Sequence, residues 1–351
     1  MKVSIGTNIK EGPWGGGNLF AINLRNYLKK HGHDVVSNLY DDDIDIILIT
    51  EPRKTSESSA FTHIDVKRYL KFVNFKTVVV HRFNECDERK NTNFVNNYLI
   101  EANKIADQSV FVSAWLKKLF VEQGLNSKNN LVIYGGANSD IFNRKGLANW
   151  TEGEKLKLVT HHWGANWNKG FEVYKYIDDL LDDDHWKQKI SFTYIGNIPK
   201  NFTFKNSNLV KPLSGSELAN KLKENNFYIT GSINEPSGNH HIEAAQCGLP
   251  ILYLNSGGTP EYCNGFGIEF NLNNIEEKIK YIFENYGNFH EKIKRYPHNS
   301  EKMSKEYLDL FEKLIEDKEE IILKRKIKKK SSGILRQIYL VTRKISEVFS
   351  N

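Results

Sequence analysis

The chain has few cysteines and no long hydrophobic run. Its 351 residues include three cysteines, Cys86, Cys247 and Cys263, which are widely separated and follow no C-x-x-C or metal-ligand spacing. This argues against a disulfide scaffold and predicts buried, reduced thiols in a cytosolic protein. No apolar stretch reaches the ~18 residues of a membrane-spanning helix, and no apolar signal region precedes the first strand. We therefore expect a protein that neither enters the secretory route nor spans a membrane.

Excess charge is also absent from most of the chain. The net charge is +6, but residues 318–351 hold 10 Lys and Arg against 3 Asp and Glu, which leaves a net charge of −1 for residues 1–317. No nucleic-acid recognition fold or aromatic-basic platform accompanies the basic tail, so we expect no nucleic-acid partner.

The tail itself combines a basic run with an apolar stripe. The run at residues 324–330 is followed by apolar residues spaced four, three, four and three, namely Ile334, Ile338, Val341, Ile345 and Val348. This spacing predicts a basic amphipathic helix that binds an anionic membrane surface through residues 324–349. A solvated, disordered tail is the alternative.

The rest of the chain repeats short apolar strands and amphipathic helices. We expect strands at residues 3–6, 35–38, 44–50, 78–81, 110–113 and 131–134, and again at 157–162, 190–195, 208–210, 226–230 and 250–254. We expect helices at residues 19–30, 171–181 and 215–224. Residues 143–154 lack apolar periodicity and predict a linker. The pattern predicts an α/β fold with two doubly wound, Rossmann-like domains, residues 1–148 and 149–300, that face each other across a cleft.

The strongest functional pattern lies in residues 226–261. Glu235 falls in the polar loop after a strand, and Glu243 falls in the first turns of the next helix. In a parallel sheet this loop is a ligand-binding edge, and the helix N-terminus favours a phosphate. A carboxylate can accept two hydrogen bonds from vicinal hydroxyls, so the two glutamates suit a sugar nucleotide. Two glutamates eight residues apart also occur by chance on solvated helices.

This segment resembles the donor-site signature of family 4 glycosyltransferases, which are retaining enzymes with the GT-B fold. Glu235 and Glu243 match its paired glutamates, and residues 244–250 and 257–261 match the E-A-x-A-x-G-x-P and G-G-x-P-E runs. Residues 107–113 and 132–142 resemble two further strands of the family. The similarity covers residues 1–316. It implies that residues 301–316, with an apolar helical stripe, cross back onto the first domain, and residues 317–351 then form the tail.

The resemblance also implies roles for individual residues. Glu235 orients the donor sugar, Glu243 binds the ribose hydroxyls, and Lys169 neutralises the leaving diphosphate. His81, at the end of its predicted strand, matches an active-site histidine that handles a proton or hydrogen-bonds the transferred sugar. Further donor contacts are expected from the two loops, through Ser237, Gly238, Asn239 and His240 and through Gly16 and Gly17.

The glycine loop at residues 11–18 has a dinucleotide site as its obvious rival interpretation. A G-x-G-x-x-G pattern that starts at Gly15 needs a small residue at position 20 and finds Phe20. A loop that closes over the donor diphosphate agrees better with the sequence, and a plain tight turn is the alternative.

Two positions depart from the family pattern. Gly164 stands where the family has an arginine five residues before Lys169, and residues 236–241 replace a G-F-G run. His161, His162, Trp163 or Asn166 could partly replace that arginine, but a strand-end histidine next to a tryptophan is more often ordinary packing. The aspartate runs at residues 41–45 and 182–184 resemble a D-x-D metal motif, yet both fall in connections beside regular elements, so no metal is expected.

The resemblance implies a retaining glycosyltransferase. It would move a sugar from a nucleoside diphosphate sugar to a glycan or lipid-linked acceptor in cell-surface polysaccharide or glycolipid synthesis, without metal or another cofactor. The expected location is cytoplasmic, peripheral on the inner membrane face. A sugar-nucleotide epimerase of related architecture remains open. So does a non-catalytic scaffold that binds sugar nucleotides, which Gly164 and the altered loop suggest.

Overall fold

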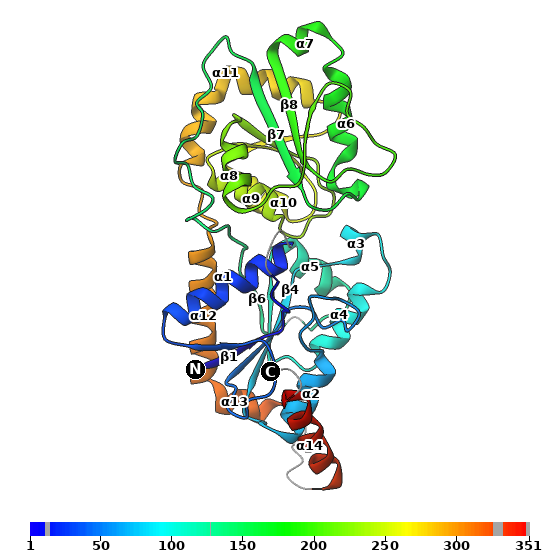
Figure 1. Cartoon of the computed structure of the whole chain (residues 1–351), viewed down its shortest axis with the longest axis vertical. Coiled ribbons are helices and arrows are strands. Elements are labelled where there is room, and N and C mark those ends of the chain that lie inside the picture. The colour runs from blue at the N-terminus through cyan, green and yellow to red at the C-terminus, as the bar shows by residue number, and fades with distance from the viewer. Residues whose placement is uncertain (11–14, 127, 326–332, 349–351) are drawn as a thin grey trace.

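The computed structural model describes residues 1–10, 15–126, 128–325 and 333–348, and it forms two α/β domains placed end to end (Figure 1). Each domain contains a six-stranded parallel sheet. The central strands, such as β3 and β10, are short and fully buried because helices cover both faces of each sheet, which is the pattern of parallel sheets. The two predicted Rossmann-like domains are therefore confirmed.

The N-terminal sheet has the strand order β2-β1-β3-β4-β5-β6. Its strands are β1 (Lys2–Ile5), β2 (Asp34–Val36), β3 (Ile46–Ile49), β4 (Val78–Phe83), β5 (Gln108–Phe111) and β6 (Asn130–Val132). Its helices are α1 (Gly16–Lys30), α2 (His63–Phe72), α3 (Asp87–Lys90), α4 (Val95–Asn103) and α5 (Ala114–Glu122). Side chains of α1 pack on one face of this sheet and those of α2 on the other.

The C-terminal sheet has the order β12-β11-β10-β7-β8-β9. Its strands are β7 (Leu156–His162), β8 (Ile190–Gly196), β9 (Asn208–Val210), β10 (Phe227–Thr230), β11 (Ile251–Leu254) and β12 (Gly267–Phe270). Its helices are η1 (Trp167–Lys169), α6 (Phe171–Leu180), α7 (Asp184–Lys189), α8 (Gly215–Lys223), α9 (Asn239–Gln246), α10 (Thr259–Cys263) and α11 (Ile275–Ile293). Because β7 and β10 are neighbours in the centre of the sheet, the loops that follow them lie together at its carboxyl edge.

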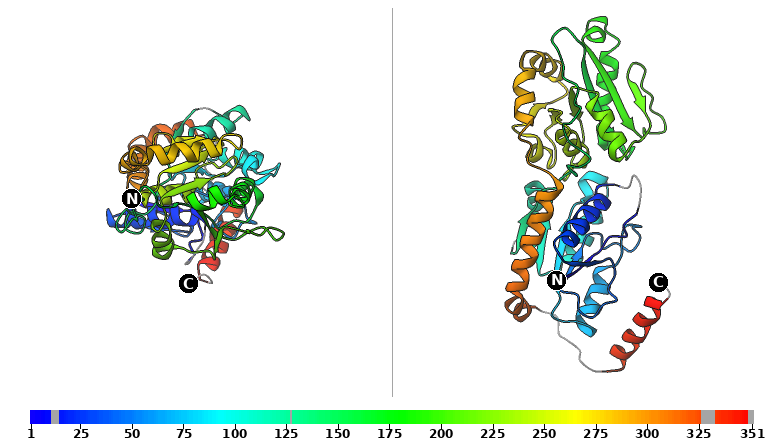
Figure 2. Two further views of the ribbon diagram at one scale, coloured as in Figure 1. Left: turned by 90° about the horizontal axis from the view of Figure 1, so that it is seen from above. Right: turned by 60° about the vertical axis from the view of Figure 1, so that its left-hand side comes forward.

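Helix α12 (Ser300–Glu316) leaves the C-terminal domain and runs along the N-terminal one (Figure 2). The Asn299 side chain caps its start by accepting a hydrogen bond from the Lys302 amide at 2.8 Å. Tyr307 and Phe311 are buried in the N-terminal core, and the Tyr307 ring lies 5.2 Å from the ring of Phe20 on α1. The apolar side of α12, which the sequence predicts, thus completes the core of the first domain.

A second contact between the two domains joins α10 to the start of α5. The Glu261 carboxylate of α10 accepts hydrogen bonds from the Ala114 and Trp115 amides, both at 2.7 Å. It caps the N-terminus of α5 from the other domain, where a negative charge opposes the positive end of the helix dipole. Tyr262 adds a hydrogen bond to the Val112 carbonyl. The G-G-x-P-E glutamate therefore contributes to the contact between the domains.

The chain ends in α13 (Lys318–Lys324) and α14 (Ile334–Val348), and α14 lies beside α2. Arg343 Nε donates to the Leu39 carbonyl at 2.9 Å, and Arg336 Nε donates to the Phe72 carbonyl at 3.1 Å. The helix predicted for this part of the tail is confirmed. The basic residues 326–330 lie outside the described residues, as do the side chains of Ile345 and Val348. Among the helices that the structure describes, none is long and apolar enough to cross a membrane.

The observed strands differ from the predicted ones at β4, which is longer, and at β12, which was not predicted. Strand β4 does not end at His81, because Arg82 and Phe83 continue the ladder opposite Val110 and Phe111 of β5. Strand β12 was not expected, since Gly267 and Glu269 break the apolar run that marks the other strands. The domain boundary at residues 148 and 149 stays a prediction, and it falls between β6 and β7.

Candidate functional site

Glu235 lies in the loop between β10 and α9, at the carboxyl edge of the C-terminal sheet. The turn after β11 holds this loop, because the Gly258 amide donates to the Glu235 carbonyl at 2.8 Å. A Cβ atom on Gly257 would lie 2.6 Å from both the amide nitrogen and the carbonyl oxygen of Glu235. Only glycine permits this approach, so the G-G pair fixes the backbone that carries the glutamate.

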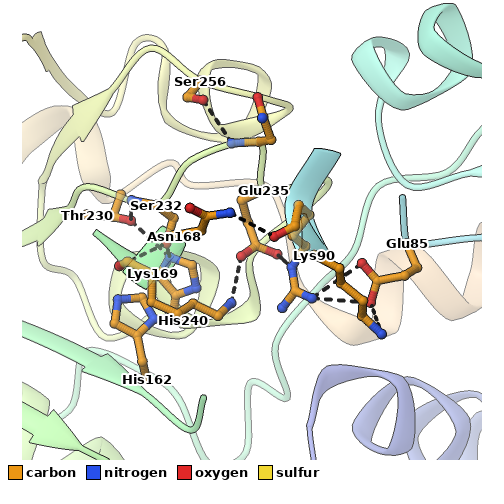
Figure 3. A network of polar contacts seen from close by, with 12 residues as sticks. Glu85, Lys90, His162, Asn168, Lys169, Thr230, Ser232, Glu235, His240 and Ser256 are labelled. Carbon is orange, nitrogen blue, oxygen red and sulfur yellow. Dashed lines mark hydrogen bonds and ion pairs between the residues drawn. The ribbon is translucent and has the colours of Figure 1, made fainter. Parts of the chain in front are cut away.

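The Glu235 carboxylate is buried between two cations (Figure 3). Lys169 Nζ lies 2.8 Å from Oε2, and Arg89 Nε lies 3.0 Å from Oε1. Burial opposes the ionised form, but Arg89 and Lys169 outweigh it and hold the pKa of Glu235 well below its usual range. Burial also lowers the pKa of Lys169, which Glu235 counteracts. The structure thus brings together the predicted Glu235 and Lys169 as a buried ion pair.

Glu243 lies on α9 and is buried as well. Its Oε2 atom is 2.9 Å from Nε2 of His161, near the end of β7. The Nδ1 atom of His161 is buried without a hydrogen-bond partner among the described residues. The sequence favours ordinary packing for His161, whereas the structure pairs it with Glu243, the residue predicted to bind the ribose.

Two helix N-termini from opposite domains meet beside these carboxylates. Helix α1 begins at Gly16 and α9 begins at Asn239, and a Cβ atom on Gly16 would lie 2.9 Å from Cγ of Asn239. Gly238, with φ of 81°, caps α9 in the left-handed region. The positive dipole ends of two helices from opposite domains therefore lie close together, which is a favourable setting for phosphate.

The other predicted loop residues take different positions. A Cβ atom on Gly135 would lie 3.0 Å from Oγ of Ser237, so Ser237 faces the N-terminal domain. A Cβ atom on Gly17 would meet only Nδ2 of Asn84, at 4.0 Å. His240 is buried behind the loop, with Nε2 3.0 Å from Oγ1 of Thr230. Donor contacts from Ser237, Gly17 and His240 stay predictions.

A fully buried histidine, His241, follows His240. Both of its ring nitrogens lack hydrogen-bond partners among the described residues, and burial lowers its pKa to about 3. The ring is therefore neutral at neutral pH and adds bulk under the loop: a Cβ atom on Gly238 would lie 2.4 Å from its Cε1 atom. In the altered run at residues 236–241, two buried histidine rings therefore pack under the loop.

His81 lies within β4 and not at its end. Nδ1 is 3.0 Å from Oδ1 of Asn103, the ring is 4.2 Å from that of Phe83, and burial lowers the pKa of His81 to about 3. Among the described residues, no hydrogen bond or ion pair joins His81 to Glu235 or Lys169. Its catalytic role stays a prediction.

The aspartate runs are occupied by structural contacts. Asp41 and Asp43 pair with Lys2, and Asp42 pairs with Arg343. The Asp183 side chain caps α7 by accepting from the His185 amide at 2.7 Å. These contacts agree with the interpretation of both runs as connections. Metal independence of the reaction stays a prediction.

We compared the sequence and the structure of the chain with known proteins. No protein-family model and no curated protein matches the sequence. A glycosyltransferase from Rickettsia africae is similar in structure, with a TM-score of 0.64 at 16% identity over 92% of this chain and 98% of that one. HepE of Anabaena, solved in complex with UDP, gives a TM-score of 0.64 at 12% identity over 89% of this chain and 100% of that one. WaaG, a glycosyltransferase of lipopolysaccharide biosynthesis, gives 0.60 at 12% identity over 89% of this chain and 99% of that one.

The chain has the GT-B fold. At identities this low, the structural similarity establishes the fold only. The activity has to be argued from the residues of the site. In this GT-B chain Glu235, Glu243 and Lys169 lie in the elements that follow β7 and β10 of the C-terminal sheet, and Glu235 contacts Arg89 of the first domain. The predicted crossover helix and the predicted two-domain architecture are both part of the observed fold.

Proposed function

We propose that this protein is a retaining glycosyltransferase that uses a nucleoside diphosphate sugar. The observation that carries the proposal is the buried pair of Lys169 and Glu235 beside two helix N-termini from opposite domains. A cation and unsatisfied amides at one point favour a diphosphate, and a carboxylate next to them can bind sugar hydroxyls. HepE, which shares the fold, has been solved with UDP-glucose, which supports a donor of this kind.

The donor would lie along the carboxyl edge of the C-terminal sheet. Glu243, oriented by its hydrogen bond to His161, binds the ribose hydroxyls. The amides at the start of α9 and Lys169 bind the diphosphate, and Glu235 binds the sugar. The acceptor, a glycan or a lipid-linked saccharide, approaches from the N-terminal domain.

Transfer breaks the bond between the anomeric carbon and the diphosphate oxygen and forms one to the acceptor oxygen. The acceptor hydroxyl passes its proton to the departing diphosphate oxygen. The acceptor attacks from the face that the diphosphate leaves, so the anomeric configuration is retained. Negative charge accumulates on the leaving diphosphate. Preorganised cations and amides that stabilise such charge are usually the largest contribution to catalysis. In this site Lys169 and the α9 N-terminus are the groups that do so.

Replacement of Glu243 by alanine tests the donor site. Loss of two charge-assisted hydrogen bonds to ribose should weaken binding of UDP or GDP by at least about tenfold in calorimetry. Glu217→Ala, at an exposed position in α8 of the same domain, should bind as the natural protein does. Equal affinities for Glu243→Ala and the natural protein would contradict the proposed ribose contact.

The last helix supports a place at a membrane surface. Arg336 and Arg343 turn one side of α14 toward the N-terminal domain, while Ile334, Ile338 and Val341 are 76%, 54% and 58% exposed. An apolar stripe that points away from the protein, in a strongly basic tail, suits the interface of an anionic bilayer. We propose that the enzyme works there, in cell-surface polysaccharide or glycolipid synthesis.

Vesicle sedimentation tests this surface. The double substitution Ile338→Asp and Val341→Asp should reduce binding to phosphatidylglycerol vesicles by at least about tenfold. The apolar side chains can be buried in the bilayer interface, whereas charged aspartates cannot. Gln337→Asp adds a charge to an exposed position of the same helix and should have a smaller effect. Binding unchanged by the double substitution would rule out α14 as the membrane contact.

A further inference from the structure

Arg89 reaches Glu235 from the opposite domain. It lies on α3, in the connection after β4 of the N-terminal domain, whereas Glu235 and Lys169 belong to the C-terminal domain. The guanidinium and the ammonium take one carboxylate oxygen each, at 3.0 and 2.8 Å. The carboxylate therefore positions two cations side by side, one from each domain.

The backbone of α3 is also tied to the C-terminal domain. Asn168 Nδ2 donates to the Arg89 carbonyl at 3.3 Å, and Asn234 Nδ2 donates to the Glu88 carbonyl at 3.3 Å. Asn168 and Asn234 are direct sequence neighbours of Lys169 and Glu235. The segments that hold the pair of Lys169 and Glu235 thus also hold Arg89 in place.

The charges in this cluster do not balance. Arg89 pairs with Glu85 at 3.2 Å as well as with Glu235, and Lys90 pairs with Glu85 at 2.9 Å. Lys169, Arg89 and Lys90 face the two carboxylates of Glu235 and Glu85, which leaves one positive charge. Because Lys90 is 37% exposed and can be solvated, this surplus charge can be balanced by water or by an anion that binds beside Arg89.

Arg89 keeps hydrogen-bonding capacity for such an anion. Nε donates to Glu235 and Nη1 donates to Glu85, while Nη2 donates to no partner among the described residues. The side chain is 24% exposed, against 11% for Lys169. Nη2 is thus available to donate a charge-assisted hydrogen bond to a phosphate oxygen.

The C-terminal domain has space beside Lys169, and among its described residues no other lysine or arginine pairs with Glu235. A Cβ atom on Gly164 would lie 3.7 Å from Cε of Lys169 and 3.5 Å from Nδ2 of Asn166. Arg89 and Lys169 are the cations that hold Glu235 ionised. The second cation that pairs with Glu235 therefore comes from the N-terminal domain.

We propose that Arg89 is the second cation of the donor site and binds the terminal phosphate of the nucleoside diphosphate. The proposal rests on the proposed function, in which Lys169 neutralises the same group. The N-terminal domain then contributes to leaving-group stabilisation, and the site is complete only when the two domains are as close as in this structure. Glu235 positions both cations in addition to binding the sugar.

Calorimetry with UDP, GDP and the matching monophosphates tests the proposal. Arg89→Gln should weaken diphosphate binding by about tenfold, the effect of one charge-assisted hydrogen bond, and change monophosphate affinity by less than twofold. Arg89→Lys should recover part of the loss. Arg68→Gln, at an exposed position of α2 in the same domain, is the matched control and should bind like the natural protein.

The outcomes separate the two levels of the proposal. Natural-like diphosphate affinity in Arg89→Gln overturns the role of Arg89 and leaves the proposed function standing. An equal loss of monophosphate and diphosphate affinity also overturns it, because Arg89 would then act only by holding the domains together. If the natural protein binds neither nucleotide, the proposed function itself fails.

Discussion

Replacement of Lys169 by methionine is expected to lower the rate of sugar transfer by about 10²–10³-fold, the range seen when one preorganised group that stabilises transition-state charge is removed. The ammonium is the cation of the C-terminal domain that touches Glu235, and methionine keeps most of the side-chain volume. The loss should appear mainly in kcat, measured as initial release of nucleoside diphosphate at saturating donor.

The fold should tolerate this change better than most changes at a buried ion pair. Arg89 remains as a partner for Glu235, so the carboxylate is not left alone. Lys175→Met is the matched control, because Lys175 is exposed on α6 and pairs only with Asp179. A Lys169→Met protein that transfers sugar as fast as the natural one would contradict the proposed catalytic role.

Replacement of Arg325 by methionine is expected to destabilise the N-terminal domain by about 3–5 kcal/mol, the cost of leaving one member of a buried ion pair alone. Arg325 follows α13, and its side chain is 3% exposed. It pairs with Asp107 at 2.5 Å and donates to the Thr77 carbonyl at 2.8 Å. The variant would bury the Asp107 charge without its partner.

Urea unfolding followed separately for each domain measures this effect, since two domains need not unfold together. The double variant Arg325→Met with Asp107→Asn should lose less than the single one, because no unpaired charge stays buried. Lys324→Met, one residue earlier at an exposed position, should change stability by less than about 0.5 kcal/mol. An equally small change for Arg325→Met would show that the pair does not anchor this segment.

The sequence was sufficient for the architecture because the strands are buried on both faces. Runs such as residues 46–49 and 78–80 are continuous and apolar, which identifies a parallel sheet without further information. Strand β4 extends past His81 because its last two residues pair with β5. The charge of Arg82 hides that extension in the sequence. It is accommodated because its guanidinium lies 3.9 Å from the centre of the Phe20 ring.

The sequence was sufficient to predict three residues of the candidate site and insufficient for two others. Glu235 and Glu243 follow a strand–loop–helix pattern that indicates a ligand edge, and Lys169 is identified through the family resemblance. Arg89 and His161 complete the two carboxylate sites, but they are 146 and 82 positions away from the glutamates they contact. Nothing local distinguishes Arg89 within its charged loop, because its role depends on how the two domains meet.

The most direct test of the central claim is a crystal structure of the protein with UDP or GDP, whichever raises its melting temperature. The account predicts the ribose hydroxyls on Glu243 and the terminal phosphate against Lys169, between the N-termini of α1 and α9. A nucleotide bound elsewhere on the molecule, or a Lys169–Glu235 pair left untouched by saturating nucleotide, would contradict it.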